Sequence, residues 1–542
     1  MPFSIDSLSL ENRIDALFAA QRGQAVPGYA VGVLHQGQVL LSKGYGLASL
    51  EHGLPIRGDT VFRIASVSKQ FTVSAVLMLA SEGRLRLGDD MRTHLPELPE
   101  LPAVVTIEHL MRNCSGLPDF LEMLRLGGVG LEFSLSRARM LQLIAANRHL
   151  SFAPGSRFLY CNTNFLLLGL IVERLSGQSL DGFLQQRIFK PLGMNRTAMC
   201  RETDVPVAGL ATPYLQWPDG SFRRAQHAFE QGGEGGMVST VEDLLLWSRH
   251  FEQPHLAPLD LPAQLAAPTT LSRGQASPYA RGVELGLFSG LATLGHGGLW
   301  PGFKTEFLRL PEAELTVVVI ANGGHLEPYR IAREVAAEVL AVPAYVKPAT
   351  AMAPLVGEWF SAPHAGQPEP ALLELAAKDG KLIATQWGMP FQLTPATDGS
   401  WVPLRGAYEF RLWPRSAELL EVEAGAGFTQ RFTRLAERPA LPAALLADLE
   451  GSYRCEHNGV QWVIGAAPGD EAGLQVRISG PVLADGGVWT LRGLSEEVLE
   501  LQGQLYWMKS SQLLRPRRDA QGRVTGLLVD TSRVRNLLFV RG

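Results

Sequence analysis

Cysteine is scarce in this chain of 542 residues, and its four cysteines are scattered with no Cys-x-x-Cys pair. A zinc site or a disulfide framework needs closely spaced cysteines or Cys/His clusters, so the sequence indicates neither. Three well-known motifs are also missing, namely HExxH, the phosphate-binding P-loop and GxSxG. Their absence argues against a zinc peptidase, a P-loop NTPase and an α/β-hydrolase. We expect no metal and no cofactor.

Long hydrophobic runs are missing as well. Segments such as FLLLGLIV at 165–172 are far shorter than the roughly 18 residues that a membrane-spanning helix needs. The first residues, MPFSIDSLSLENRIDALF, lack the basic and apolar regions of a signal peptide. A net charge of −4 offers no basic surface for nucleic acid. We therefore expect a cytoplasmic protein with neither a membrane nor a nucleic acid as partner.

The first 340 or so residues mix helical and strand patterns. Two strands around a Gln-Gly turn are predicted at 30–46, and two apolar helices that each stop near a glycine at 68–85 and 164–177. A hairpin with a buried second strand follows at 305–322, and a closing helix at 327–340. Because strands lie at both ends and helices between them, we expect an α+β domain whose sheet joins both ends of the segment.

A Pro/Ala-rich stretch at 341–354 ends this pattern, and short strands and turns follow it. LVGEWFS and LEGSYRC begin two blocks whose glycines, Gly357 and Gly451, are 94 residues apart, with an aromatic residue two positions later in each. Evenly spaced short strands of this kind predict two related antiparallel β-barrels of the small, lipocalin-like type. The predicted domains are 1–345, 346–445 and 446–542.

The stretch RIASVSKQF places Ser66 three residues before Lys69, at the head of a predicted helix. One helical turn apart, the two side chains project from the same face. A serine hydroxyl needs a base within hydrogen-bond reach to act as a nucleophile, and a lysine serves when burial or a nearby cation lowers its pKa. A Ser-x-x-Lys pair also arises readily by chance, so by itself it is equally typical of two ordinary helix residues.

Two further motifs follow along the chain. FLYCNTNF places Tyr160 and Asn162 two residues apart, so that one can relay a proton and the other can hold a substrate carbonyl. Alone, this pair is more typical of a buried tyrosine beside a helix-capping asparagine. TLGHGGLWPGF places His296, Gly298 and Leu299 in a glycine-rich stretch, where a substrate can lie against a strand edge and meet backbone N–H groups.

The order and spacing of these three motifs resemble the serine hydrolases that include class C β-lactamases, D,D-peptidases, related esterases and D-aminopeptidases. The resemblance covers about residues 10–340. Supporting stretches are TIEHLMRNCSGLPDF, FAPGSRFLYCNTNF, IFKPLGMNRTAM and GGMVSTVEDL. It implies a catalytic domain like that of β-lactamases and penicillin-binding proteins.

The resemblance also implies roles for individual residues. Ser66 would be acylated, Lys69 and Tyr160 would move protons, and the N–H groups of Ser66 and Leu299 would form the oxyanion hole. The residues that it places beside the substrate or the oxyanion hole are Asn162, His296, Gly298 and Leu299.

Two features point to one branch of this family. His296 stands where β-lactamases and D,D-peptidases usually have lysine, and a neutral imidazole is a weaker anchor for a substrate carboxylate. The length and the two β-modules resemble bacterial D-aminopeptidases. This implies release of an N-terminal D-residue from small peptides, amides or esters through an acyl-enzyme, and a homodimer. The alternative is a broad esterase, or a D,D-peptidase or β-lactamase-like hydrolase that acts on β-lactams with the same residues.

In the D-aminopeptidases a loop of the last barrel reaches the active site, and its acidic residue binds the substrate ammonium. Two loops offer such a carboxylate here. GPVLADGGVW contains Asp485, and GLSEEVLEL contains Glu496 and Glu497. The sequence does not choose between them, and either loop is also typical of a solvated turn.

Overall fold

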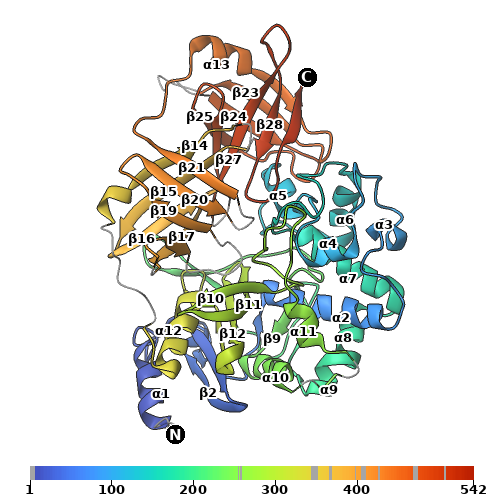
Figure 1. The fold of residues 1–542 in the computed structure, drawn as a ribbon, viewed down its shortest axis with the longest axis vertical. Coiled ribbons are helices and arrows are strands. Elements are labelled where there is room, and N and C mark those ends of the chain that lie inside the picture. Colours follow the sequence, from blue (N-terminus) through green and yellow to red (C-terminus); the bar gives the residue numbers. More distant parts are fainter. Residues whose placement is uncertain are drawn as a thin grey trace.

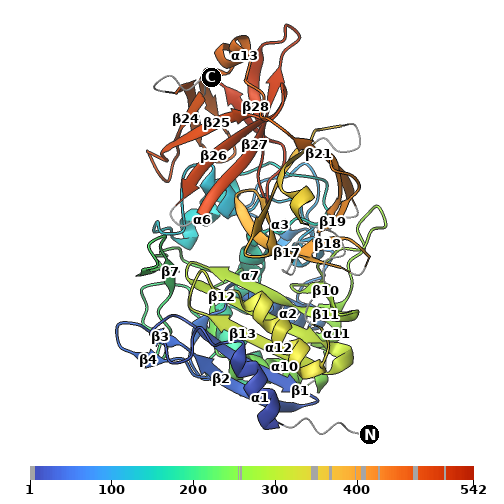
Figure 2. The same ribbon diagram turned by 90° about the vertical axis from the view of Figure 1, so that its left-hand side faces the viewer.

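A computed structural model describes residues 7–253, 255–256, 259–343, 352–364, 369–396, 398–403, 410–424, 428–467, 474–505 and 508–542. Residues 344–351 of the predicted linker lie outside this part of the chain. Figures 1 and 2 show the sheet and the N-terminus at the bottom of the molecule, and the second barrel and the C-terminus at the top.

A six-stranded antiparallel sheet forms the centre of the first domain. Its strands, in the order β10-β11-β12-β13-β1-β2, are β10 (Glu284–Phe288), β11 (Leu291–Trp300), β12 (Phe303–Leu310), β13 (Leu315–Ala321), β1 (Tyr29–His35) and β2 (Gln38–Tyr45). β1 pairs with β13, with Val31 opposite Val319. The predicted α+β sheet that joins both ends of the segment is therefore confirmed.

Helices cover both faces of this sheet. Val31 of β1 packs in one apolar cluster with Ile331 of α12 (Pro328–Leu340), next to α1 (Ser7–Ala16). Its neighbour Ala30 belongs to the opposite cluster with Leu244 of α10 (Val241–Glu252). Since successive residues of a strand point to opposite faces, both sides of the sheet are buried.

The helical part lies between the strands of the two chain ends. α2 (Lys69–Ser81) and α7 (Asn162–Ser176) pack against each other, and Gly177 in the left-handed conformation ends α7. The other helices are α3 (Met91–His94), α4 (Ile107–Met111), α5 (Phe120–Arg125), α6 (Arg137–Ala146), α8 (Leu180–Leu184), α9 (Lys190–Leu192) and α11 (Leu261–Ala266). Short strands are β3 (Leu47–Ser49), β4 (Leu54–Pro55), β5 (Phe62–Arg63), β6 (Ala198–Met199), β7 (Tyr214–Gln216), β8 (Phe222–Arg224) and β9 (Met237–Ser239).

Two closed antiparallel barrels follow, as predicted, and in each the strands are neighbours in sequence order. The first comprises β14 (Gly357–Ser361), β15 (Ala371–Lys378), β16 (Lys381–Gln386), β17 (Met389–Pro395), β18 (Trp401–Pro403), β19 (Phe410–Pro414), β20 (Leu419–Ala424) and β21 (Phe428–Leu435). The helix α13 (Ala443–Leu449) precedes the second. Its strands are β22 (Gly451–Arg454), β23 (Gln461–Ala466), β24 (Leu474–Ser479), β25 (Val488–Gly493), β26 (Leu499–Leu505), β27 (Met508–Arg518), β28 (Val524–Asp530) and β29 (Leu537–Arg541).

The two barrels begin in the same way. Gly357 and Gly451 have φ values of 140° and 142°, which favour glycine. Two positions later, Trp359 donates its indole N–H and Tyr453 its hydroxyl to the carbonyl four residues earlier, each at 2.9 Å. These shared details show that the short sequence match marks a true structural repeat.

The second barrel is joined to the first domain through α5. Met123 and Leu126 belong to the apolar core of the barrel. Trp462 donates its indole N–H to the Leu126 carbonyl at 3.0 Å, and the Asn458 amide donates to the Met123 carbonyl at 3.1 Å. This contact fixes the loops of the barrel relative to α5.

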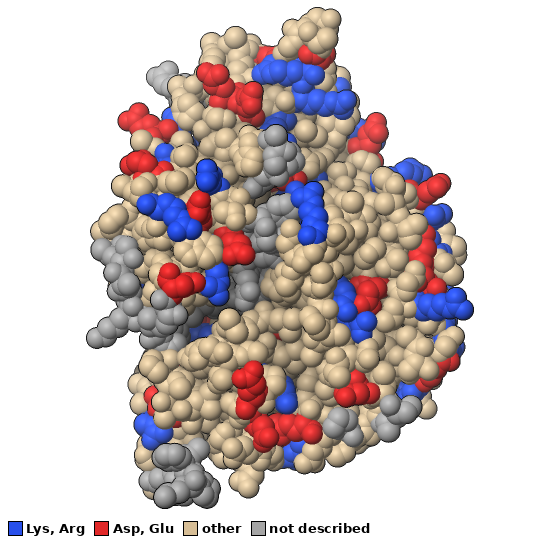
Figure 3. All heavy atoms as spheres, in the orientation of Figure 1, with Lys and Arg blue, Asp and Glu red and all other residues tan. Residues whose placement is uncertain are grey.

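The surface carries charges of both signs. Figure 3 shows Lys and Arg interspersed with Asp and Glu over the face that it draws. In the part of the chain that the structure describes, no helix is both long and apolar enough to cross a membrane.

Candidate active site

Ser66 lies in a short 3-10 turn, Ala65–Ser68, directly before α2. Ala65 has a φ of +47°, a left-handed conformation that strains any residue with a side chain. The Ser68 hydroxyl donates to the Ala65 carbonyl at 2.6 Å and accepts from the Met237 N–H at 3.2 Å. The turn is thus held from two sides, and it presents Ser66 to a surface cavity.

Lys69 is completely buried below Ser66. Its Nζ lies 2.6 Å from the Glu234 carbonyl oxygen and 2.9 Å from Asn162 Oδ1, and 3.0 Å from Ser66 Oγ. Burial lowers the pKa of Lys69 to about 7. A neutral amine has two N–H groups and one lone pair. Because both carbonyl oxygens only accept, the two N–H groups serve them and the lone pair faces the Ser66 hydroxyl.

The orientation of Asn162 is fixed by Asp119. Asp119 Oδ2 accepts from the Asn162 backbone N–H at 2.6 Å and from its Nδ2 at 2.9 Å, so that Oδ1 faces Lys69. Asp119 is held in turn as the N-cap of α5, where its Oδ1 accepts from the N–H groups of Leu121 and Glu122. The carboxylate therefore positions the base through the asparagine.

Tyr160 lies two residues before the start of α7 and is 6% exposed, in the wall of the cavity. Its ring centroid is 4.9 Å from Lys69 Nζ. Asn113 fixes the backbone on both sides: its carbonyl accepts from the Leu159 N–H at 2.9 Å and its Oδ1 from the Cys161 N–H at 3.1 Å. The phenol is thus placed beside the base and beside the space above Ser66.

His296 is buried in β11 and is neutral. Its Nε2 lies 2.9 Å from the Tyr279 hydroxyl and its Nδ1 2.6 Å from the Gly297 carbonyl oxygen. The carbonyl only accepts, so the proton is assigned to Nδ1 and Nε2 accepts from Tyr279. Burial and the Lys69 charge lower the pKa of His296 to about 3. The imidazole is therefore no cationic anchor for a carboxylate.

Gly298 and Leu299 lie on a free stretch of β11. β10 pairs with β11 only as far as Gly295, so the next residues form a strand edge beside the cavity. A Cβ on Gly298 would lie 2.4 Å from the Ile64 carbonyl oxygen, so glycine is needed where the strand passes the Ser66 turn. Leu299 lines the cavity together with Ser66.

The structure brings most of the predicted residues together. Those that line the one cavity are Ser66, Tyr160, Asn162, His296 and Leu299. Lys69 lies directly below Ser66, and Gly298 adjoins the turn that carries it.

The structure places the three predicted acidic residues in exposed turns. Asp485 lies in an exposed turn, where its Oδ1 accepts from the Gly487 N–H at 3.0 Å. Glu496 and Glu497 lie in the exposed turn between β25 and β26. None of the three is among the described residues that line the cavity. The turn of Asp485 lies instead against Gly127 and Gly128, directly after α5. Among the described residues of the cavity wall, the second barrel contributes Met508 and Arg533 and no acidic residue.

Four residues of the site were not predicted from the sequence, namely Asp119, Glu234, Tyr279 and Arg533. Glu234 offers its carbonyl to Lys69, and its carboxylate accepts from the Gly232 N–H at 2.8 Å. Burial raises the pKa of this carboxyl. Asp119 lies in the supporting stretch TIEHLMRNCSGLPDF, and Glu234 directly precedes the supporting stretch GGMVSTVEDL, which is the signal that was available for them.

Among the residues described, no group of three or more His, Cys, Asp or Glu side chains is placed to hold a metal ion. The arrangement is instead a hydroxyl nucleophile, a buried amine whose pKa is lowered to about 7, and a phenol around one cavity. Such a set can transfer an acyl group to serine and move the protons that this step requires.

Comparison with known proteins agrees with this chemistry. The Beta-lactamase family model matches residues 14–341. A D-aminopeptidase from Gluconobacter oxydans is 29% identical over 516 residues, which cover 91% of this chain and 90% of that protein. The octameric penicillin-binding protein homologue from Pyrococcus abyssi superposes with a TM-score of 0.57 at 20% identity, over 79% of this chain and 100% of that one.

A further solved structure has the same fold. The D-amino acid amidase from Ochrobactrum anthropi, complexed with L-phenylalanine, gives a TM-score of 0.52 at 21% identity. The superposition covers 61% of this chain and 99% of the amidase chain.

Proposed function

This chain belongs to the beta-lactamase family, and we propose that it is a serine hydrolase that releases the N-terminal D-amino acid from small peptides, amides or esters. The observation that carries the serine chemistry is the buried Lys69 Nζ, 3.0 Å from Ser66 Oγ. The preference for D-residues is supported by the likeness to the Gluconobacter oxydans D-aminopeptidase along 91% of the chain.

Acylation begins when Ser66 Oγ attacks the substrate carbonyl carbon and its proton passes to neutral Lys69. A C–O bond forms, and the carbonyl oxygen becomes an oxyanion that accepts from the N–H groups of Ser66 and Leu299. When the intermediate collapses, the C–N bond breaks. The leaving amine takes a proton from Tyr160, and Lys69 restores the proton of the phenol.

Deacylation reverses these roles. Water adds to the ester carbonyl and gives one proton to neutral Lys69, directly or through the Tyr160 hydroxyl, which passes on its own proton. Collapse then breaks the bond to Ser66 Oγ, which takes a proton back. The products are the free D-amino acid and the starting enzyme.

The test is hydrolysis of D-alanine and L-alanine p-nitroanilides side by side. We expect p-nitroaniline from the D-form only, and none from Ser66→Ala. Ser81→Ala is the matched control, because Ser81 is an exposed serine at the end of α2. Full turnover by Ser66→Ala would exclude Ser66 as the nucleophile. If the protein hydrolyses neither anilide but turns over p-nitrophenyl acetate or nitrocefin, the result would favour the esterase or β-lactam alternative.

Assembly, compartment and domain limits are proposals too. We infer a homodimer, which light scattering would detect as about 118 kDa, twice the chain mass of 59.0 kDa. A cytoplasmic location is supported by four buried cysteines that are all free thiols. The domain limits 345 and 445 are testable by limited proteolysis.

A further inference from the structure

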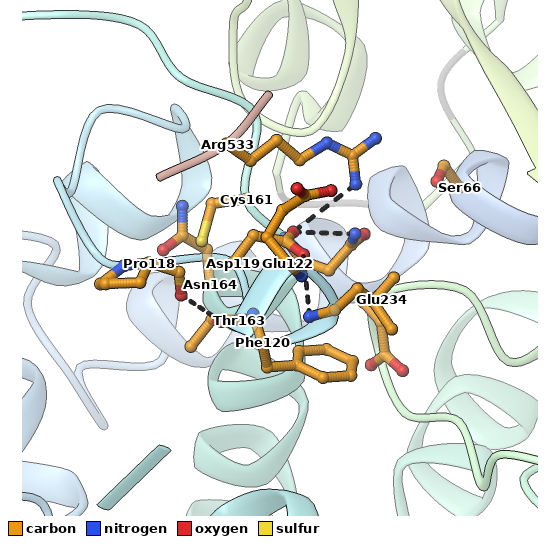
Figure 4. Close-up of polar contacts among 12 residues, drawn as sticks. Ser66, Pro118, Asp119, Phe120, Glu122, Cys161, Thr163, Asn164, Glu234 and Arg533 are labelled. Carbon is orange, nitrogen blue, oxygen red and sulfur yellow. Dashed lines mark hydrogen bonds and ion pairs between the residues drawn. The ribbon is translucent and has the colours of Figure 1, made fainter. Parts of the chain in front are cut away.

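The second barrel places an arginine in the wall of the active-site cavity. Arg533 lies in the loop between β28 and β29 and lines the same cavity as Ser66 and Tyr160. Its Cζ is 4.8 Å from the centroid of the Tyr160 ring, and its Nη1 is 3.7 Å from Asp119 Oδ2. Figure 4 shows the side chain extending from its loop toward Ser66, with the guanidinium beside Asp119.

The loop that carries Arg533 is held from both domains. Within the barrel, the Asn536 N–H donates to Asp530 Oδ1 at 2.9 Å. On the side of the first domain, the Arg535 N–H donates to Ser151 Oγ at 3.1 Å, and His149 Nε2 lies 2.7 Å from the Arg535 carbonyl oxygen. Arg533 is therefore presented to the cavity by a braced loop and not by a free arm.

Positive charge is sparse in the described wall of this cavity. Its cationic side chains are Arg125 and Arg533. Arg125 forms an ion pair with Glu122. His296 is neutral, and Lys69 is buried on carbonyl oxygens below the cavity floor.

Part of the Arg533 side chain is exposed in the cavity wall. Its ion pair with Asp119 spans 3.7 Å, which is longer than an N–H···O hydrogen bond. Asp119 has no exposed surface, and its carboxylate oxygens accept hydrogen bonds from Asn162 and from the start of α5. The Arg533 side chain, by contrast, is 20% exposed. A guanidinium with an accessible face suits a carboxylate, which it can bind through two parallel N–H groups.

We propose that Arg533 binds the free C-terminal carboxylate of the substrate, and that the preferred substrate is a D-residue joined to a very short leaving group such as one amino acid. The inference rests on the proposed function, since in an aminopeptidase the rest of the peptide is the leaving group. Arg533 and Ser66 line one cavity, so a carboxylate on Arg533 is close to the scissile bond. Glu284, which also lines this cavity, supplies the opposite charge for an ammonium group.

The test compares D-alanyl-glycine with D-alanyl-glycinamide. Both have the same acyl group and the same scissile bond, and they differ in the carboxylate. In the unmodified protein we expect kcat/KM to be about 10- to 100-fold higher for the dipeptide, the range typical of a hydrogen bond to a charged group. The difference should lie mainly in KM. This measurement needs no variant, so it does not depend on how a variant folds.

Variants then assign the preference to Arg533. In Arg533→Gln the ratio of the two kcat/KM values should fall to about 1, and Arg533→Lys should keep part of it. Any effect on the chemical step lowers both rates and cancels in the ratio. Arg523→Gln is the matched control, an arginine of the same barrel that is 74% exposed and away from the cavity, and it should keep the full ratio.

Two outcomes would overturn the inference alone. One is a ratio near 1 in the unmodified protein while D-alanine p-nitroanilide and the glycinamide are both hydrolysed. The other is a ratio that Arg533→Gln leaves unchanged. If the unmodified protein hydrolyses none of the three D-alanine substrates, both the proposed function and the inference fail.

Discussion

Asp119 Oδ2 accepts hydrogen bonds from both nitrogens of Asn162, the backbone N at 2.6 Å and Nδ2 at 2.9 Å. With Nδ2 held there, only Oδ1 can face Lys69. A flipped amide would direct N–H groups at the amine and would compete for the lone pair that faces Ser66. A carboxylate on α5 thus decides the direction in which the proton of Ser66 can move.

We expect Asp119→Asn to lower kcat for D-alanine p-nitroanilide by about 100-fold, the size of effect that a small misplacement of catalytic groups produces. The new amide would present a donor either to Asn162 or to the start of α5, where only acceptors fit. Steady-state kinetics with circular dichroism would separate this effect from unfolding. Asp260→Asn is the control, because Asp260 caps α11 and is exposed. Unchanged kcat in Asp119→Asn would show that Asn162 is positioned by other contacts.

Gly298→Ala tests the close approach between β11 and the Ser66 turn. The added Cβ would meet the Ile64 carbonyl oxygen at 2.4 Å, so the strand has to shift away from the turn. We expect kcat/KM to fall at least about 10-fold, because the Leu299 N–H moves with the strand. Gly88→Ala is the matched control, since nothing lies within 4 Å of its Cβ position. Equal activity in the two variants would remove the edge of β11 from the mechanism.

The sequence predicted the nucleophile and its base because their geometry is local. A spacing of three residues places Ser66 beside Lys69 whatever the rest of the chain does. The structure adds that Ser66 belongs to a 3-10 turn with Ala65 strained before it, so the helix begins at Lys69. Helical periodicity does not distinguish this turn from the first turn of a helix.

The role of Arg533 could not be predicted from the sequence, because its position depends on how the second barrel packs against the first domain. It meets Asp119 only because the second barrel takes α5 into its own core and binds it through Trp462 and Asn458. No local pattern encodes contacts between segments so far apart. The loops with Asp485 and with Glu496 and Glu497 were candidates by charge, yet none of these residues is among the described residues of the cavity wall.

Tyr279→Phe tests the support of His296. The variant removes the hydroxyl that donates to Nε2 and leaves a buried nitrogen without that donor. We expect the free energy of unfolding to fall by about 1 to 3 kcal/mol in urea titrations, together with a several-fold loss of kcat/KM. Tyr453→Phe removes a comparable buried hydroxyl bond in the second barrel and should lower stability without changing kcat/KM. A loss of activity of equal size in both variants would point to a general effect of stability.

The acid limb of the pH profile of kcat/KM should follow the protonation of Lys69. The amine accepts the proton of Ser66 only when it is neutral, so kcat/KM for D-alanine p-nitroanilide should rise with pH through a pKa near 7 and decline below it. After burial, the strongest influences on this pKa are the charges of Glu234 and Asp119, which raise it, and that of Arg533, which lowers it.

Arg533→Gln should therefore move the acid limb to higher pH. Removing a positive charge makes the protonated amine easier to form, so a higher pH is needed to keep Lys69 neutral. Arg523→Gln, which alters an exposed charge of the same barrel, should leave the limb in place. A limb that stays in place or moves to lower pH in Arg533→Gln would mean that the charge of Arg533 does not act on the titrating group. The shift of the limb is measured with the anilide and the carboxylate preference with the two peptides, so each role of Arg533 is tested separately.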